Sequence, residues 1–453
     1  MKNIKKLIFV GFGPATIGGL LALSRILKKD DPVSILVIEK SENLSKSSLS
    51  GLRSDGKIFV SEEIGGSIQI PLSLQNDILN FYLSFINKHD LEEITSKHKN
   101  YEKIFNEESK NFHKFGFKLA KADYYHIGTD LLPQLLTSIF DNFTKIFTDL
   151  NIPFSTIFSC EQVDIDFLSK LVIFSNILLK NKKSIEHFDR LFIGVGRSGY
   201  KFLETFKKNN PEYANKENIP IVDFGVRIEY PAFITEELDK KFYEFKVFYK
   251  TDYNQIIRSF CNNPNGFIVT EEYENKMTTV NGHSFKEKKS ENSNFAILCS
   301  HKFTEPFNQP NTYLEKIVEL ANTLSGKNKV ILQTFKDFKN NKRTKKLWRT
   351  KPTLNSDSYI LGDLNYIFPR KTAESIIEFI NNLGKIIPGI DADDNLIYGI
   401  EAKFYNEILN SKLLKKDNIY LIGDCSGKTR SIMYATCHGY TEVLNVIEEG
   451  IYE

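Results

Sequence analysis

Two glycines and a carboxylate near the start of this chain have the types and spacing needed to hold a dinucleotide. Gly11 and Gly13 follow the apolar run 7–10, and a second apolar run, 34–38, ends at Glu39. Glycine permits a tight turn and a close approach of backbone to a pyrophosphate, and the N–H groups of the next helix attract that anion. Glu39 would then accept hydrogen bonds from a ribose. The order strand, glycine turn, helix, strand and acid predicts a dinucleotide-binding βαβ unit.

The helix that follows this turn is expected to open with Pro14, Ala15 and Thr16. Thr16 stands where the dinucleotide pattern has glycine or alanine, because helix and strand pack closely there. Gly18 and Gly19 follow directly, and we expect them to relieve the crowding.

A second feature, near the C-terminus, indicates which dinucleotide is bound. The apolar run 418–422 ends in Gly423 and Asp424, and a helix is expected to begin near Thr429. This arrangement resembles the second FAD motif of flavoproteins, in which the aspartate holds the ribityl chain. FAD is long, so its flavin half needs an anchor of its own, and the helix would aim its positive end at the flavin. The alternative is that Asp424 only caps the helix.

The glycine-rich run Gly194-Val-Gly196-Arg-Ser-Gly199 allows two interpretations. It follows the apolar strand 191–193 and a β-meander, which is where one-dinucleotide flavoproteins carry a glycine-rich return of the chain over FAD. It also precedes a helix-like segment, and Glu229 closes a later strand, so it would suit a second unit for NAD(P)H. We favour the contact with FAD and keep the NAD(P)H site as the alternative.

Three side chains in the middle of the chain would handle an anionic or carbonyl-bearing substrate. Arg227, Arg258 and His283 lie on motifs that are too polar for ordinary strands. A guanidinium binds carboxylates through paired hydrogen bonds, and an imidazole donates or accepts a proton near neutral pH. We name these three as the candidate catalytic residues. The alternative is that both arginines form structural ion pairs and that His283 belongs to a turn beside Asn281-Gly282.

The order of the elements predicts an α/β fold, with a discontinuous Rossmann-like FAD-binding domain and an inserted mixed α+β substrate domain. Apolar periodicity predicts an amphipathic helix over 131–150. The expected parts are a first FAD-binding segment at 1–60, a helical insertion at 61–116, a second FAD-binding segment at 117–200, a substrate domain at 201–409, and a final FAD-binding strand and helix at 410–453.

The composition restricts the partners. Lys and Arg total 60 against 57 Asp and Glu, and the net charge of +3 implies no global attraction to nucleic acid or anionic lipid. No stretch reaches the roughly 18 uninterrupted apolar residues of a membrane span. The five cysteines are scattered without a C-x-x-C spacing, which predicts reduced thiols and no metal site. We expect a cytoplasmic protein that acts on a small molecule, without a nucleic-acid or membrane partner and without thiol catalysis.

One local charge run stands apart from this average. Residues 336–351 hold many Lys and Arg around the only tryptophan, Trp348. A basic run with an aromatic residue suits contact with RNA, although a solvated loop is the commoner case.

A set of motifs that occurs in one order gives this chain a family resemblance. The motifs are Gly51-Leu-Arg-Ser54-Asp-Gly-Lys57, His126-Ile-Gly-Thr-Asp130, Gly194-Val-Gly-Arg-Ser-Gly199, Gly225-Val-Arg-Ile-Glu229, Arg258-Ser-Phe-Cys261-Asn-Asn-Pro264-Asn-Gly266, Val280-Asn-Gly-His-Ser284, Ser293-Asn-Phe-Ala296 and Gly423-Asp-Cys-Ser-Gly-Lys-Thr-Arg430. Together they resemble a family of FAD-dependent dehydrogenases, which is itself similar to the two-domain glutathione-reductase-like flavoproteins.

The resemblance implies an FAD-dependent oxidoreductase that passes a hydride between the flavin and a small organic substrate, with NAD(P)H or another acceptor in the second half-reaction. The open alternatives are an NAD(P)H-dependent flavin reductase, a flavin-containing protein that binds or modifies RNA, and a scaffold without redox turnover. With their neighbours, the expected cofactor-binding residues are Gly11, Gly13, Pro14, Ala15, Thr16, Glu39, Lys40, Ser54, Asp55, Lys57, Val163, Gly194, Gly196, Gly423, Asp424, Thr429, Arg430 and Ser431.

Overall fold

The computed structural model describes residues 4–46, 56–87, 90–92, 94, 101–179, 182–214, 221–273, 276–304, 307, 309–326, 328–405 and 409–448. The chain divides into two compact units. Unit 1 is Met1–Leu91, Asp130–Asn218 and Asn406–Glu453, and unit 2 is Glu92–Thr129 and Ile219–Tyr405. The segment 61–116, expected as one helical insertion, is divided between them, because α2 (Leu72–Leu83) belongs to unit 1 and α4 (Tyr101–His113) to unit 2.

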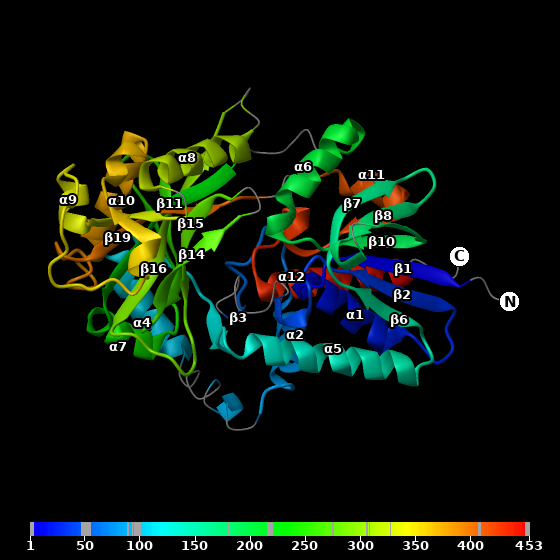
Figure 1. Cartoon of the computed structure of the whole chain (residues 1–453). Coiled ribbons are helices and arrows are strands. Elements are labelled where there is room, and N and C mark those ends of the chain that lie inside the picture. The colour runs from blue at the N-terminus through cyan, green and yellow to red at the C-terminus, as the bar shows by residue number, and fades with distance from the viewer. Residues whose placement is uncertain are drawn as a thin grey trace. The chain divides into compact units, whose positions relative to one another are not determined.

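Unit 1 is built on a five-stranded parallel sheet (Figure 1). Its strands, in spatial order, are β20 (Ile419–Leu421), β10 (Arg190–Ile193), β1 (Lys5–Val10), β2 (Val33–Ile38) and β6 (Phe154–Ile157). The central strands are nearly continuous apolar runs, as a parallel sheet covered on both faces requires. Because every strand points the same way, the segments after β1, β2, β10 and β20 all lie at one edge of the sheet.

The remaining elements of unit 1 cover this sheet or extend from it. The helices are α1 (Pro14–Ile26), α2, α5 (Leu132–Asp149), α6 (Tyr200–Asn209), α11 (Ser411–Lys416) and α12 (Ile432–Glu448). The strands are β3 (Lys57–Val60) and the antiparallel meander β7 (Cys160–Asp166), β8 (Leu171–Asn176) and β9 (Lys182–His187). The amphipathic helix predicted over 131–150 is confirmed as α5, which turns Leu136, Ile139 and Phe143 into the core.

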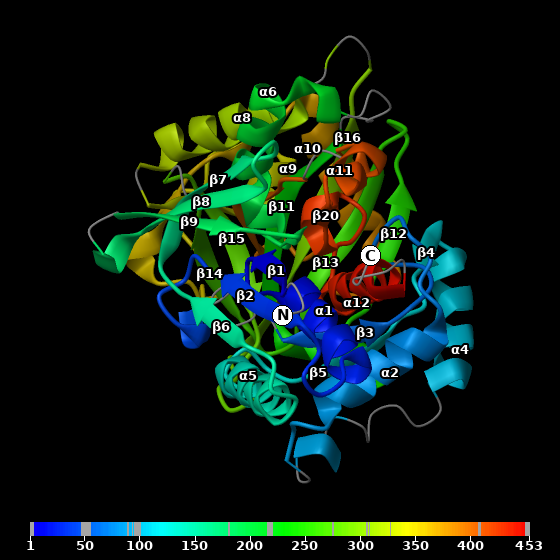
Figure 2. The same cartoon turned by 90° about the vertical axis from the view of Figure 1, so that its right-hand side faces the viewer.

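Helices α1 and α12 lie side by side at a distance that only glycine permits (Figures 1 and 2). A Cβ atom on Gly18 would lie 1.9 Å from the carbonyl oxygen of Thr436, and one on Gly439 would lie 1.9 Å from that of Ala15. A Cβ atom on Gly19 would lie 2.8 Å from the ring of Phe9. The glycines expected to relieve crowding around Thr16 therefore allow a helix–helix contact.

Unit 2 is built on an eight-stranded mixed sheet. Its strands, in spatial order, are β18 (Tyr359–Leu361), β17 (Val330–Thr334), β19 (Leu396–Lys403), β11 (Ile221–Pro231), β16 (Asn292–Lys302), β13 (Ile256–Asn263), β12 (Val247–Lys250) and β4 (Phe117–Leu119). The other strands are β5 (Asp123–His126), β14 (Phe267–Glu272) and β15 (Thr278–His283), and the helices are α4, α7 (Glu236–Lys241), α8 (Pro310–Ser325), α9 (Phe335–Lys339) and α10 (Arg370–Leu383). Strand β11 is central, and residues 222–230 are all buried.

These two sheets confirm the predicted fold class, an α/β Rossmann-like domain assembled from separated segments with a mixed α+β unit inserted. Among the described residues, no helix is both long enough and apolar enough to cross a membrane.

The glycine contact between α1 and α12 predicts that Gly18→Ala destabilises unit 1. Alanine has a helix propensity about 1 kcal/mol better than glycine, but its Cβ would force two backbones apart. We expect a net loss of about 2 kcal/mol, measured as a lower thermal unfolding midpoint. Ser24→Ala on the same helix is the control, since Ser24 already carries a Cβ. An equal midpoint for both variants would show that the helices separate without cost.

Candidate functional site

The turn after β1 lies against the turn after β10. Gly11 has φ +94°, and a Cβ there would lie 2.7 Å from the carbonyl oxygen of Gly194. Its N–H donates to the carbonyl of Ile38 at 2.7 Å, and the N–H of Gly194 donates to Val10 at 2.8 Å. From β1 the chain builds the sheet outward in one direction through β2, and from β10 in the other through β20. The two glycine turns therefore meet at a topological switch point, where open α/β sheets bind ligands.

The N-terminus of α1 starts at this point and has a positive dipole end available. Gly13 occupies the cap position, no side chain caps the helix there, and the first turn holds no acidic residue. Helix α1 therefore begins as anion-binding helices do. The Thr16 hydroxyl donates to the carbonyl of Gly11 at 2.6 Å. A Cβ on Gly194 would lie 3.1 Å from the same Thr16 hydroxyl oxygen. Threonine fits in place of glycine or alanine because its hydroxyl turns back onto the glycine turn.

Glu39, at the end of β2, holds the first turn in place. Its Oε2 accepts the N–H of Phe12 at 2.5 Å, and its Oε1 accepts the N–H and the hydroxyl of Ser41 at 2.8 and 2.6 Å. A carboxylate has about four lone-pair sites, and these bonds use three of them. The remaining acceptor site lies on Oε2, where a ribose hydroxyl would bind.

Asp424 lies in the turn after β20 and contacts Thr429, which was predicted, and Arg197, which was not. The Thr429 hydroxyl donates to its Oδ1 at 2.7 Å, and the Nε of Arg197 lies 3.5 Å from its Oδ2. Burial raises the pKa of Asp424, while Arg197, the Thr429 hydroxyl and Arg430 act in the opposite direction. The Ser431 hydroxyl accepts the N–H of Tyr434 in the first turn of α12. Ser431 therefore caps this helix, which removes the alternative that Asp424 serves only as the cap.

His438, a residue not predicted from the sequence, positions the Gly423-Asp424 turn from α12. Its Nδ1 accepts the N–H of Gly423 at 3.0 Å, and its Nε2 lies 3.7 Å from Glu442. Accepting at Nδ1 requires a neutral ring with its proton on Nε2. Burial lowers the His438 pKa to about 4, which keeps the ring neutral. The sequence signal that would have identified His438 is a histidine within the otherwise apolar stretch of α12.

The turn at 194–199 belongs to the same edge as the other glycine turns. Gly196 has φ +65°, and a Cβ there would meet nothing within 4 Å. Its neighbour Arg197 lies against Asp424. Glu229, the acid that the NAD(P)H alternative needs, lies on β11, which pairs antiparallel with β16 and β19. These strands do not form the second parallel βαβ unit that this alternative requires.

The other predicted cofactor residues have separate surroundings. Lys57 is buried on β3, Lys40 is exposed after Glu39, and Val163 packs against the core of unit 1. The Arg430 N–H donates to the carbonyl of Gly65 at 2.7 Å. Ser54 and Asp55 lie outside the described residues.

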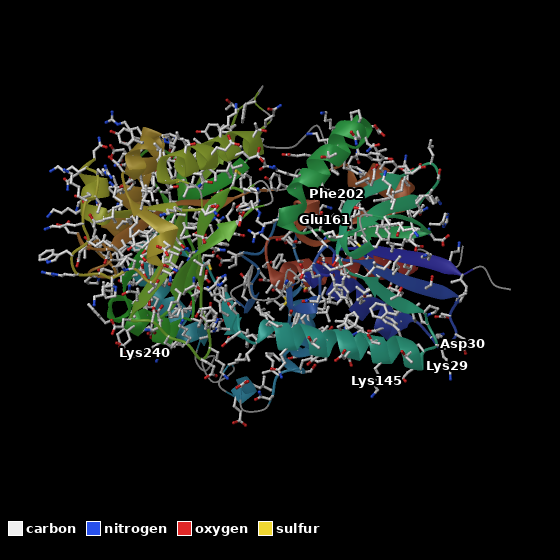
Figure 3. All side chains as sticks on the ribbon, viewed as in Figure 1. Lys29, Asp30, Lys145, Glu161, Phe202 and Lys240 are labelled. Atoms are coloured by element: carbon white, nitrogen blue, oxygen red, sulfur yellow. The ribbon has the colours of Figure 1, made fainter. Side chains whose placement is uncertain are left out.

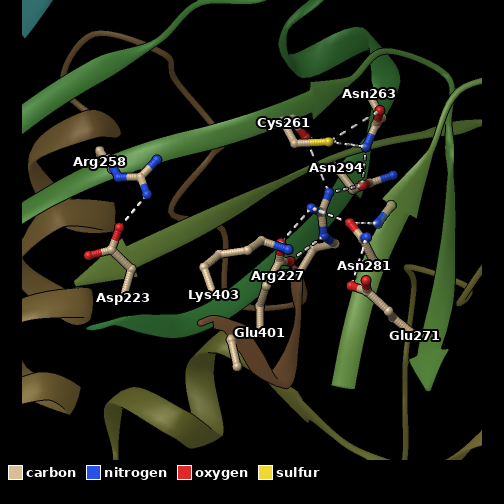
Figure 4. Close-up of polar contacts among 12 residues, drawn as sticks. Asp223, Arg227, Arg258, Cys261, Asn263, Glu271, Asn281, Asn294, Glu401 and Lys403 are labelled. Atoms are coloured by element: carbon tan, nitrogen blue, oxygen red, sulfur yellow. Dashed lines mark hydrogen bonds and ion pairs between the residues drawn. The ribbon is translucent and has the colours of Figure 1, made fainter. Parts of the chain in front are cut away.

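In unit 2, Arg227 is fully buried and makes an ion pair with Glu401 (Figure 4). Its Nε and one terminal nitrogen donate to the Glu401 carboxylate at 2.7 and 3.0 Å. The other donors reach the carbonyl of Cys261 and the side chains of Asn294 and Asn281, at 3.2, 2.8 and 3.4 Å. All five N–H groups therefore have protein acceptors. Arg227 has the geometry of a structural ion pair, and its catalytic role stays a prediction.

Arg258 differs because its bonds use one nitrogen. A terminal NH2 group donates to Asp223 and, at 3.0 Å, to the hydroxyl of Tyr405. The guanidinium carbon of Arg258 lies 4.9 Å from the ring centroid of Phe260, and the ammonium of Lys403 lies 5.6 Å from the same centroid. The guanidinium is nearly buried, and its other N–H groups are the ones suited to an anionic ligand.

His283 is buried on β15, opposite Phe267 of β14. The structure places it in a strand and not in the turn of the alternative interpretation. Sequence reasoning missed Glu401 and Asn294, the partners of Arg227. The available signal was an acid within the apolar run 396–402. The described residues include no group of His, Cys, Asp and Glu suited to hold a metal ion.

The comparisons with known proteins concern unit 2 most directly. Residues 223–404 match the family described as FAD-dependent protein, C-terminal domain-like. This segment is a domain of that family. The resemblance of the sequence to FAD-dependent flavoproteins is thus confirmed, and the matched residues nearly coincide with the second segment of unit 2.

Relatives of the whole chain are more distant. A Clostridium beijerinckii protein described as uncharacterized is 23% identical over 352 residues, which span 72% of this chain and 62% of that protein. A glycerol-3-phosphate dehydrogenase from Bacillus halodurans, complexed with FAD, aligns at TM-score 0.40 and 9% identity, over 99% of this chain and 65% of that one. A flavoprotein/dehydrogenase from Cytophaga hutchinsonii aligns at TM-score 0.37 and 9% identity, over 99% and 80%. Similarity this low says nothing about the substrate.

The buried His438 predicts an acid-sensitive stability for this protein. Its folded pKa of about 4 lies below the ordinary 6.5, so the unfolded state takes up a proton first as the pH falls through this window. His301 of unit 2 has the same shift from burial. Between about pH 7 and about pH 5, the parent protein should lose about 2 kcal/mol more of its free energy of unfolding than His438→Gln, a variant that keeps an acceptor for Gly423.

The measurement is the thermal unfolding midpoint of both proteins across this pH range. His187→Gln, at an exposed position, is the control and should reproduce the parent curve. Parallel curves for His438→Gln and the parent would contradict the buried neutral histidine.

Proposed function

We propose that this protein is an FAD-dependent oxidoreductase that acts on a small anionic organic substrate. The observation that carries the proposal is the convergence of Gly11, Glu39, Gly196 and Asp424 at one edge of one parallel sheet. Four segments from distant parts of the chain supply the features needed along an extended dinucleotide. FAD, when bound, supplies a carrier that takes up or gives away a hydride.

The residues of this edge fit the parts of FAD. The uncapped N-terminus of α1 suits the pyrophosphate, and the remaining acceptor site of Glu39 suits the ribose of the adenosine half. The open space at Gly196 leaves room for a ligand beside the backbone. Asp424, held by Thr429 and Arg197, would accept a hydroxyl of the ribityl chain.

Unit 2 would supply the substrate contacts. Three cations surround the ring of Phe260, namely Arg258, Lys246 and Lys403, with the Lys246 ammonium 5.2 Å from the ring centroid. A cationic group beside an aromatic ring suits a carboxylate attached to an apolar body. His283 stays the candidate for proton transfer.

Thiol chemistry receives no support from Cys425, the cysteine beside Asp424. Burial raises the pKa of Cys425 to about 12, and its thiol donates to the carbonyl of Ile193 at 2.8 Å. A thiol that stays protonated is a weak nucleophile.

Removal of the Asp424 carboxylate should weaken FAD binding. We expect Asp424→Ala to bind FAD at least about tenfold more weakly, because a buried hydrogen bond to a charged group is worth about 1.5–3 kcal/mol. Calorimetric titration of the apoprotein with FAD measures this affinity. Asp149→Ala, at an exposed position of α5, is the control. Equal affinities for Asp424→Ala and the control would overturn the assignment of this carboxylate.

Gly196→Ala distinguishes FAD from NAD(P)H at the turn 194–199. Because the Cβ would enter the open space beside this turn, we expect lower FAD content in the purified variant. The absorption spectrum of flavin released on denaturation measures that content. A variant that keeps full FAD but loses NADPH oxidation would instead assign this turn to NADPH.

A further inference from the structure

One segment of unit 2 carries a charge that the rest of the chain does not share. The basic segment, residues 338–356, contains no acidic residue. Its cations are Lys339, Lys342, Arg343, Lys345, Lys346, Arg349 and Lys351. The net charge of the whole chain is only +3, so this segment is a strong local exception to the average.

The charges of the basic segment face solvent. Lys339 shares Asp393 with Lys336, at 3.4 and 3.2 Å. The other six cations are exposed, and none of them forms an ion pair within the described residues. Unpaired cations in one short segment attract a polyanion and are screened by salt.

The backbone of the basic segment is held by buried contacts. The Thr344 hydroxyl accepts the N–H of Thr334 at 3.0 Å and donates to Asp337 at 2.7 Å. The side-chain amide of Gln333 donates to the carbonyl of Lys342 at 2.7 Å. Leu347 packs against the apolar core of β17 and β19. The cations are therefore presented from a fixed chain, which lowers the entropy cost of binding.

Trp348 supplies a flat surface among these cations. Its side chain is 78% exposed, and the guanidinium carbon of Arg349 lies 4.4 Å from its ring centroid. An exposed indole beside an arginine is the arrangement on which unpaired bases stack, and the cations around it would contact the flanking phosphates.

We propose that the basic segment binds single-stranded nucleic acid, with a base stacked on Trp348 and phosphates on the surrounding lysines and arginines. An anionic membrane is the less suitable partner. Trp348 is exposed, whereas its neighbour Leu347 is partly buried and packs against the core, so the Trp348 ring is the main apolar surface that this segment offers to a lipid phase. The proposal is independent of the redox function and departs from the expectation drawn from net charge, because net charge averages out a local surface.

The test uses the whole chain of 453 residues and the fluorescence of Trp348, which reports on this site alone because the chain has one tryptophan. The probes are oligouridylate and oligothymidylate of about 20 nucleotides, longer than common single-strand sites. We expect quenching of Trp348 and an affinity that falls steeply between about 50 and about 200 mM salt. Comparison of the two oligomers distinguishes RNA from DNA.

Two variants separate the roles within the basic segment, with binding followed by the anisotropy of labelled oligomers. The triple variant Lys342→Gln, Lys345→Gln, Lys346→Gln should reduce the slope of log affinity against log salt by about 2, at about 0.7 per phosphate contact. Trp348→Ala should weaken binding about tenfold and leave that slope unchanged.

The charge-matched control is Lys28→Gln, Lys29→Gln, Lys145→Gln. These lysines of unit 1 are exposed, and Lys29 and Lys145 extend away from the ribbon (Figure 3). The control should bind like the parent. If the triple variant has an altered thermal midpoint, it is replaced by Lys342→Gln and Lys345→Gln as single substitutions.

Three outcomes would overturn the proposal. The first is the absence of binding to both oligomers at low salt. The second is equal affinity and equal Trp348 quenching with inorganic polyphosphate, which has charge but no bases. The third is a blue shift of Trp348 emission on vesicles of phosphatidylserine and phosphatidylcholine without a response to the oligomers, which would assign the basic segment to a lipid surface.

Discussion

In unit 1, the sheet edge that carries the candidate site depends on close contacts between backbone segments. Gly11 meets the carbonyl of Gly194, Gly18 meets that of Thr436, and Gly439 meets that of Ala15. These contacts fix how far α1 lies from β10 and from α12. The N-terminus of α1 then points at the switch point, and α12 brings His438 to the N–H of Gly423. The geometry of the proposed cofactor-binding edge thus depends on glycines at a few positions where a side chain would not fit.

In unit 2 the main constraint is the burial of charged side chains within the sheet. Burial is the largest single influence on Arg227 and opposes its charge, but the Glu401 carboxylate and the contacts with Cys261 together raise the Arg227 pKa. The pKa of Glu401, which burial alone would raise, is held low by Arg227 and Lys403. Gly282 gives the space in which β15 lies over this cluster, since a Cβ there would lie 2.3 Å from Arg227. Removal of one partner would leave a buried charge uncompensated, so the cluster holds its strands in one register.

Local signals explain what the sequence predicted well. The glycine turn at Gly11, the helix over 132–149 and the strand before Gly423 depend on neighbouring residues and on apolar periodicity. Partners far apart in sequence depend on strand register, and Glu401 lies 174 residues from Arg227. Thr16 departs from the local pattern, yet its fit is decided by Gly194, which no local rule includes. Ser431 is predicted to contact the cofactor, and the structure adds a second role, because its hydroxyl caps α12.

The pairing of α1 with α12 has a consequence for biosynthesis. Residues 14–26 leave the ribosome more than four hundred residues before residues 432–448, which cover them. Until then the glycine face of α1, at Gly18 and Gly19, lacks its native cover. Contacts of such long sequence separation form slowly and leave apolar surface exposed in the meantime. Unit 1 therefore completes its fold only after its last segment is made, whereas most of unit 2 lies in one continuous segment, 219–405, whose contacts do not wait for α12.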